Sequence, residues 1–250
     1  MVWRSCLAGL RRFSRYGRGA GLGKGRRAFA RYSALAALAL LPALAGAGRA
    51  AEAEGRVELL AFGDSLTQGY GLPQGQGLVP QLEGWLTAQG RAVTVINGGV
   101  SGDTTAGGLS RIAWSLTPEV DAVLVILGGN DLLRGLAPEE TRANLDGILA
   151  EITARDLPVM LVGMQAPGNY GAAYQQAFDA LYPELAETYG AVFAPSFLAP
   201  LMGDPSAPDP AAARAFLQAD GIHPNGEGVA RIVATLGPQV ETLLDRATTP

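Results

Sequence analysis

Cysteine and histidine, which hold most zinc ions in proteins, are almost absent from this sequence. The 250 residues include one cysteine, Cys6, and one histidine, His223. A single cysteine excludes an internal disulfide and a thiolate metal site. With one histidine, only carboxylates remain as further ligands, so we expect no metal site. We also expect no other cofactor. Since 48% of the residues are apolar, the chain can stabilise itself through one sizeable core.

Acidic residues are missing from the first fifty positions, which carry ten basic ones. A run of small and apolar residues, 33–48, is shorter than the roughly 20 residues of a membrane-spanning helix and contains Pro42. A basic segment, a short apolar segment and a segment of small residues follow one another in this order. This predicts that residues 1–50 are an export signal that is removed from the mature protein. "RRAFAR" (26–31) resembles a twin-arginine motif, while ordinary secretion and an uncleaved anchor stay open as alternatives. We therefore expect a periplasmic or secreted protein with one domain, residues 51–250.

Basic residues are scarce in the rest of the chain. After residues 1–50, 9 of the 19 basic residues remain against 23 acidic ones, a formal net charge of −14. A body with this charge repels nucleic acids and anionic lipid headgroups. We therefore exclude DNA and RNA as partners and expect no stable insertion of the mature chain into a membrane. For the oligomeric state we expect a monomer.

Short apolar runs alternate with stretches of helical periodicity from residue 57 onward. The strand candidates are residues 57–62, 92–97, 122–128, 158–164 and 191–197, and the helix candidates between them are 78–90, 104–116, 138–154 and 174–190. The strands are continuously apolar, as expected when helices cover both faces of a parallel sheet. This alternation predicts an α/β fold, a three-layer α/β/α sandwich with a central five-stranded parallel sheet.

Glycine-rich and polar segments interrupt the apolar pattern where strands end. The first strand runs into Gly63-Asp64-Ser65, the second into "NGGVSGDTT" (97–105) and the third into "GGND" (128–131). A fourth segment, "DGIHPNGEG" (220–228), contains the histidine. Because ligands bind outside the carboxyl ends of the strands in an open parallel sheet, we expect these segments to converge on one edge.

The side chains in these segments suit acyl transfer. A serine hydroxyl such as that of Ser65 needs a base to take its proton, and His223 is the only imidazole available. Asp220, three residues earlier, can fix the orientation and tautomer of that imidazole. Attack on an acyl carbon places negative charge on the carbonyl oxygen, so hydrogen-bond donors must already point at that position. The best candidates are the N–H groups of Ser65 and Gly102 and the Asn130 amide.

Simpler roles fit two acidic residues of the same segments. We expect Asp64 to bond the backbone of its turn rather than act as a catalytic acid. Asp103 is predicted to be the N-cap of the following helix. No G-x-S-x-G surrounds Ser65, which argues against the nucleophile elbow of an α/β-hydrolase.

Four blocks resemble those of a known family. "FGDSLTQGYG", "GVSGDTT", "GGND" and "DGIHPN" are similar to blocks I, II, III and V of the SGNH, or GDSL, hydrolases, over nearly the whole chain after residue 51. "LGGNDLLRGLAP" and "PGNYGAAYQQAFDALYPELA" further resemble the periplasmic thioesterase I, lysophospholipase L1 and arylesterase branch. The resemblance implies a flavodoxin-like fold with Ser65 as nucleophile, Asp220 and His223 completing a triad, and Ser65, Gly102 and Asn130 as oxyanion donors.

The same branch has a mobile loop beside its acyl site, which corresponds to residues 133–138 here. This implies Leu133, Leu136 and Pro138 as substrate-binding candidates, and a place in the core is the alternative for the two leucines. The activity implied is that of a serine esterase acting on arylesters and short to medium acyl esters, with acyl thioesters and lysophospholipids as further substrates. A carbohydrate O-deacetylase of the same superfamily and a non-catalytic lipid or glycan carrier are the alternatives.

Overall fold

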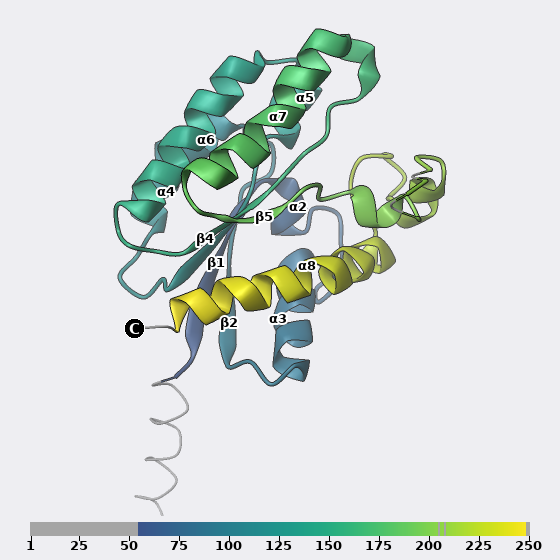
Figure 1. The fold of residues 1–250 in the computed structure, drawn as a ribbon. Helices are drawn as coiled ribbons and strands as arrows, with labels where there is room; N and C mark the ends of the chain where they lie inside the picture. The colour runs from purple at the N-terminus through teal and green to yellow at the C-terminus, as the bar shows by residue number, and fades with distance from the viewer. Residues whose placement is uncertain (1–54, 205, 208, 249–250) are drawn as a thin grey trace, which may run out of the picture. The chain divides into compact units, whose positions relative to one another are not determined.

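Five parallel strands form the centre of the fold (Figure 1). A computed structural model of the protein describes residues 55–204, 206–207 and 209–248, so the predicted export signal lies outside the described residues. The strands are β1 (Val57–Gly63), β2 (Val93–Gly99), β3 (Ala122–Ile126), β4 (Val159–Val162) and β5 (Val192–Ala194). Their order in the sheet is β2-β1-β3-β4-β5, and every neighbouring pair is parallel. The predicted sheet is confirmed.

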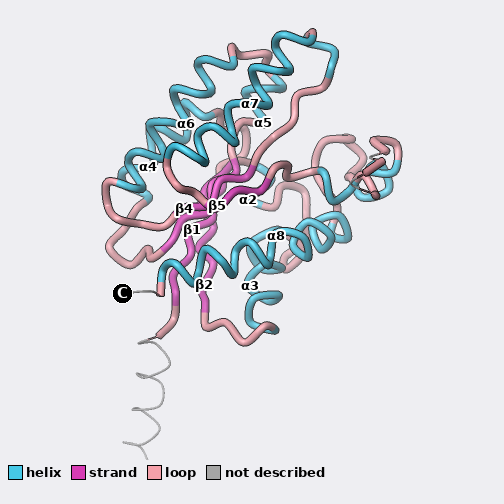
Figure 2. The backbone as a smooth tube through the Cα atoms, in the orientation of Figure 1, coloured by secondary structure: helices cyan, strands magenta, loops and turns pink. Residues whose placement is uncertain are grey.

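Helices cover both faces of this sheet (Figures 1 and 2). One face carries α3 (Leu78–Ala88) and α8 (Gly226–Ala247), and the other carries α4 (Thr105–Ser115), α6 (Pro138–Thr153) and α7 (Ala172–Thr188). Two short helices, α2 (Ser65–Gln68) and α5 (Gly129–Leu133), begin directly after β1 and β3, and the 3₁₀ turns are η1 (Gly168–Tyr170), η2 (Ala199–Leu201) and η3 (Ala212–Phe216). The predicted three layers are therefore confirmed.

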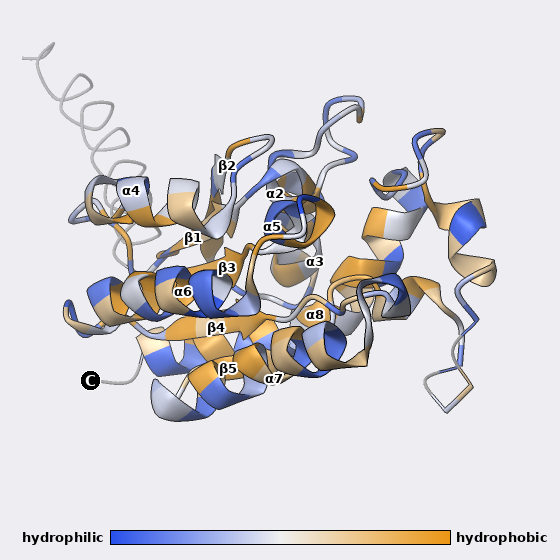
Figure 3. Cartoon of the chain, turned by 90° about the horizontal axis from the view of Figure 1, so that it is seen from above, coloured by the Kyte–Doolittle hydropathy of each residue, from blue (hydrophilic) through white to orange (hydrophobic). Residues whose placement is uncertain are grey.

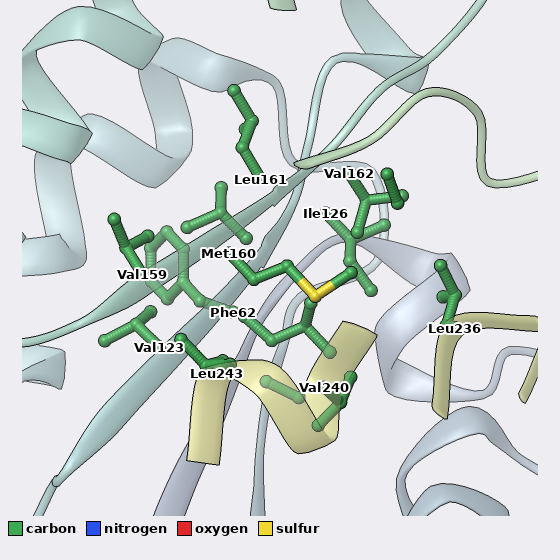
Figure 4. Packing of buried hydrophobic residues seen from close by; sticks show 14 of the residues in the cluster. Phe62, Val123, Ile126, Val159, Met160, Leu161, Val162, Leu236, Val240 and Leu243 are labelled. Atoms are coloured by element: carbon green, nitrogen blue, oxygen red, sulfur yellow. The ribbon is translucent and has the colours of Figure 1, made fainter. Parts of the chain in front are cut away.

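The core lies between the sheet and the two helical layers. All five residues of β3 and all four of β4 are buried, as their unbroken apolar runs predict. Figure 4 shows Met160 of β4 packed with Val240 and Leu243 of α8. Full burial of one such side chain contributes about 1.5–3 kcal/mol. Figure 3 shows the same division by hydropathy, with apolar residues along the strands and polar ones on the outer sides of the helices.

The strand order changes direction at β1. The chain leaves β1 for β2 on one side and later adds β3 on the other side of β1. Segments that leave β1 and β3 therefore diverge toward opposite faces, and open sheets bind ligands at the crevice this creates.

No helix in the described part of the chain is long and apolar enough to cross a membrane.

Candidate active site

Ser65 stands at the junction of β1 and α2. Gly63 makes the junction tight, because a Cβ atom there would lie 2.1 Å from Thr67 Oγ1 and 2.5 Å from the Ile126 carbonyl oxygen. Asp64 caps α2, since its Oδ1 accepts a hydrogen bond from the Leu66 N–H at 3.0 Å. The predicted backbone-bonding role of Asp64 is confirmed.

A chain of hydrogen bonds links Ser65 to His223 and Asp220. His223 Nε2 lies 2.8 Å from Ser65 Oγ, and His223 Nδ1 lies 2.7 Å from Asp220 Oδ2. Asp220 Oδ1 accepts the N–H groups of Ile222 at 2.9 Å and of His223 at 3.0 Å. The Ile222 N–H, followed by the imidazole, lowers the pKa of Asp220 to about 2. The carboxylate of Asp220 fixes the orientation of the imidazole through Nδ1, so that Nε2 faces the hydroxyl of Ser65.

A short reversal of the chain holds Asp220 and His223. Gln218 N–H donates to the His223 carbonyl at 2.7 Å, and Leu217 forms an antiparallel bridge with Pro224. Gly221 takes φ +70°, the left-handed conformation that glycine adopts readily. Gln218 Nε2 also donates to the Tyr70 carbonyl at 2.8 Å, which fixes this turn to the segment that follows Ser65.

The Tyr70 ring lies against the imidazole. The ring centroids of Tyr70 and His223 are 4.8 Å apart with an interplanar angle of 41°. Hydrogen bonds and one ring contact therefore restrain His223 from three sides.

Two backbone N–H groups at this edge are free to receive an oxyanion. The N–H groups of Ser65 and Gly102 have no acceptor among the described residues, and both residues line the same pocket. Gly102 has φ +84° in the turn between β2 and α4. These are two of the three donors that the sequence predicts.

The third predicted donor, Asn130, is already engaged. Its Nδ2 donates to Asp64 Oδ2 at 3.1 Å and to the Asp103 carbonyl at 2.9 Å, so both amide hydrogens have acceptors. The helix that carries Asn130 is anchored by buried Asp131, whose Oδ2 accepts the Thr105 N–H at 2.9 Å. The structure thus brings Asn130 to the site with its amide shared between two segments.

Asp64 is the buried acid of the site. Only 1% of its surface is exposed, and burial raises its pKa to about 6 against the opposing effects of the Leu66 N–H and the Asn130 amide. Asp64 lines the pocket and accepts the Asn130 amide, while Asp220 is the carboxylate that contacts the imidazole.

The prediction that Asp103 is an N-cap is wrong by one residue. Thr104 caps α4 instead, because its side chain accepts the Gly107 N–H at 3.3 Å. The carboxylate of Asp103 is occupied by Arg111, whose Nε lies 2.6 Å from Asp103 Oδ2. Arg111, two turns into α4, thus attracts the side chain of Asp103, which local sequence rules assign to the end of the helix.

A mostly apolar pocket of about 420 Å³ opens beside Ser65 and His223. Its apolar side chains come from segments that follow β1, β3, β4 and β5. They are Leu66, Tyr70, Leu132, Leu133, Met164, Leu198, Met202 and Ile222. Leu133 lies here as predicted. Leu136 and Pro138 do not, because Leu136 is fixed through its backbone to Asp131 and Tyr174, and Pro138 begins α6 and lines a separate pocket beside α7.

Several lining residues were not predicted. Tyr70 and Ile222 lie within two of the four sequence blocks, close in the chain to Ser65 and His223. Their place in the pocket could therefore have been predicted from the sequence. Met164 and Leu198 follow β4 and β5, whose carboxyl ends lack the glycine-rich polar segments that the sequence shows after β1, β2 and β3. Among the residues that the structure describes, no three histidine, cysteine or acidic side chains are grouped so that they could hold a metal ion.

Comparison with known proteins identifies the family. Residues 61–231 match the GDSL-like Lipase/Acylhydrolase family. The chain belongs to this family. It is an ester-hydrolysing enzyme, and the family that the four blocks predict is confirmed.

The relatives agree with the predicted branch. "Esterase TesA" of Pseudomonas aeruginosa is 37% identical over 74% of this chain and 89% of that protein. "Thioesterase 1/protease 1/lysophospholipase L1" of Escherichia coli is 34% identical over 75% of this chain and 85% of that protein. The crystal structure of AlinE4, an SGNH-hydrolase family esterase, superimposes with a TM-score of 0.60 at 44% identity and covers 76% of this chain and 97% of its own.

Proposed function

We propose that the protein is a serine esterase that forms an acyl-enzyme on Ser65, with His223 as base and Asp220 as its partner. The observation that supports this most is the unbroken pair of hydrogen bonds, 2.8 Å from Ser65 Oγ to Nε2 and 2.7 Å from Nδ1 to Asp220. A carrier protein with the same fold would have no need of this arrangement.

The reaction follows from the atoms in place. Ser65 Oγ attacks the carbonyl carbon while its proton passes to Nε2 of His223, and Asp220 stabilises the imidazolium that forms. The carbonyl oxygen becomes an oxyanion beside the N–H groups of Ser65 and Gly102. His223 then gives the proton to the departing alcohol or thiol as the carbon–oxygen or carbon–sulfur bond breaks. Water repeats the sequence on the acyl-enzyme and releases the acid.

Asn130 serves as the third oxyanion donor in this proposal. One amide hydrogen must turn from Asp64 or from the Asp103 carbonyl, or be shared with the oxyanion. Removal of one such donor typically lowers the rate by about 10²–10³. We therefore expect Asn130→Ala to lower kcat by about this factor.

The pocket favours esters with an apolar acyl or aryl part. Its volume of about 420 Å³ falls within the usual range for small-molecule sites, and its apolar lining suits a short to medium acyl chain or an aryl group. Acyl thioesters and lysophospholipids are included because the Escherichia coli relative is named for both activities. The apolar lining argues against a carbohydrate O-deacetylase, whose substrate is polar around the acetyl group.

The leader completes the proposal. We infer that residues 1–50 direct export and are removed, which leaves residues 51–250 as a single periplasmic or secreted domain. Sequencing the amino terminus of the exported protein tests this directly, and a protein retained in the cytoplasm with an intact leader would contradict it.

The decisive experiment is a series of p-nitrophenyl esters of increasing acyl length, with Ser65→Ala as the blank. We expect kcat/KM to rise beyond the acetyl ester, and a fluorophosphonate to label the wild type but not Ser65→Ala. A strict preference for acetyl would favour the deacetylase, and turnover by Ser65→Ala at the wild-type rate would remove Ser65 as the nucleophile. Absence of both turnover and labelling would favour a carrier.

A further inference from the structure

Arg111 of α4 makes four contacts beneath the catalytic edge. Its Nε donates to Asp103 Oδ2 at 2.6 Å, and its Nη1 and Nη2 donate to the carbonyl oxygens of Gly98 at 2.9 Å and Gly63 at 2.8 Å. The guanidinium carbon also lies 3.9 Å from the centre of the Phe62 ring. Only 11% of the Arg111 side chain is exposed, so these are not contacts of a mobile surface residue.

The three acceptors belong to the segments that carry the proposed oxyanion donors. Gly63 ends β1 two residues before Ser65, and Gly98 lies near the end of β2. Asp103 follows Gly102, and its carbonyl accepts one hydrogen of the Asn130 amide. One rigid side chain thus connects β1, β2 and the turn on which two donors depend.

We propose that Arg111 is a positioning residue that fixes the spacing of the oxyanion donors. This rests on the proposed esterase function. The guanidinium holds the turn of Gly102 and Asp103 against the end of β1, so the N–H groups of Ser65 and Gly102 point at one place. Through the Asp103 carbonyl it also restrains the Asn130 amide.

The chemistry requires arginine at this position. Its planar fork presents five N–H donors in fixed directions and can satisfy a carboxylate and two carbonyls together while stacking on an aromatic ring. A lysine keeps the charge but carries its donors on one atom, which cannot reach acceptors on β1, β2 and Asp103 with the same geometry. The acceptors that lysine leaves unpaired would bind water or move, and the proposed oxyanion donors would move with them.

Arg155 provides a matched control. It also binds two carbonyl oxygens and a carboxylate, with Nη1 2.7 Å from the Leu116 oxygen and Nη2 2.8 Å from both the Ala113 oxygen and Glu151 Oε1. It connects the carboxyl end of α4 to α6 and does not line the pocket. A purely structural role for Arg111 would make the two arginines equivalent.

The test compares Arg111→Lys with Arg155→Lys on one p-nitrophenyl ester. Because misplacement of reacting groups by about 1 Å can cost about 10²-fold, we expect Arg111→Lys to lower kcat by about 10–100-fold while KM changes less than about 3-fold. An alkyl trifluoromethyl ketone, whose adduct with Ser65 Oγ places an oxyanion in the hole, should bind Arg111→Lys at least about tenfold more weakly. Arg155→Lys should match the wild type in both measurements.

Coupling to Asn130 separates positioning from general destabilisation. In an Asn130→Ala background, Arg111→Lys should cost less in kcat than in the wild type, because the two changes disturb the same donor set. Equal losses in both backgrounds, or an Arg111→Lys that behaves like Arg155→Lys, would overturn the proposal. Should Arg111→Lys fail to fold, Asp103→Asn replaces it, and an unchanged kcat in that variant would overturn the proposal as well. Failure of the esterase proposal itself would be seen separately, as turnover that survives Ser65→Ala.

Discussion

Burial and charge oppose each other at Asp64, beside Ser65. Its carboxylate caps α2 and accepts the Asn130 amide, yet 1% exposure raises its pKa from 3.8 to about 6. The folded protein therefore binds the Asp64 proton more tightly than the unfolded chain does. This difference in pKa stabilises the folded state by about 3 kcal/mol below pH 4, and the stabilisation is lost as the pH rises through 6.

We predict that Asp64→Asn removes this pH dependence. The asparagine oxygen can still cap α2, so the unfolding free energy of the variant relative to the wild type should improve by about 3 kcal/mol between pH 4 and pH 7.5. Activity should fall, because the Asn130 amide loses its anionic acceptor. Urea denaturation at both pH values gives the difference, with exposed Asp156→Asn as the control. A relative stability that does not change with pH would contradict the assignment.

At the scale of elements, glycines set how closely α4 approaches the sheet. A Cβ atom at Gly108 would lie 2.5 Å from Leu127 Cδ1 and 3.3 Å from atoms of Ile148 and Phe62. α4 carries Arg111 one turn later, so this close approach also determines where the guanidinium lies. Gly84 on α3 is the opposite case, since a Cβ atom there meets nothing within 4 Å.

We therefore predict opposite effects of the same substitution in two helices. Gly84→Ala should stabilise the protein by about 0.5–1 kcal/mol through helix propensity and leave kcat unchanged. Gly108→Ala gains the same propensity but must overpack the core, so it should destabilise by about 1–3 kcal/mol and lower kcat. Thermal unfolding and ester turnover of both variants measure this. Equal effects at the two sites would show that the α4 contact can relax.

At the scale of the whole molecule, the net charge predicts how binding depends on the charge of the substrate. Residues 51–250 carry 9 basic against 23 acidic side chains, so the enzyme body repels anionic substrates at long range. Salt screens this repulsion, since the Debye length falls from about 30 Å at 0.01 M to about 8 Å at 0.15 M.

KM for an anionic acyl-CoA thioester should therefore fall as salt rises over this range, while KM for a neutral nitrophenyl ester should stay constant. Steady-state kinetics on both substrates at the two ionic strengths test this. An acyl-CoA KM that rises with salt would instead indicate a local cationic site near the pocket.

The sequence by itself determined the order of elements and the chemistry of the candidate site. Unbroken apolar runs of strand length can be buried only in a covered parallel sheet, and polar segments at their carboxyl ends must then share one edge. With a single imidazole in the chain, no other partner for Ser65 was available. Asp220 could be predicted equally well, because only two residues separate it from His223 and their contact therefore depends on local turn geometry.

Only the tertiary structure decided how the proposed oxyanion donors are held. Asn130 shares its amide between Asp64 and the Asp103 carbonyl, and Arg111 draws Asp103 away from the helix cap that local rules assign to it. The sequence also did not predict the pocket walls that follow β4 and β5, or the absence of Leu136 and Pro138 from the pocket. The reason is physical: these features depend on distances between segments far apart in the chain, which sequence periodicity does not encode.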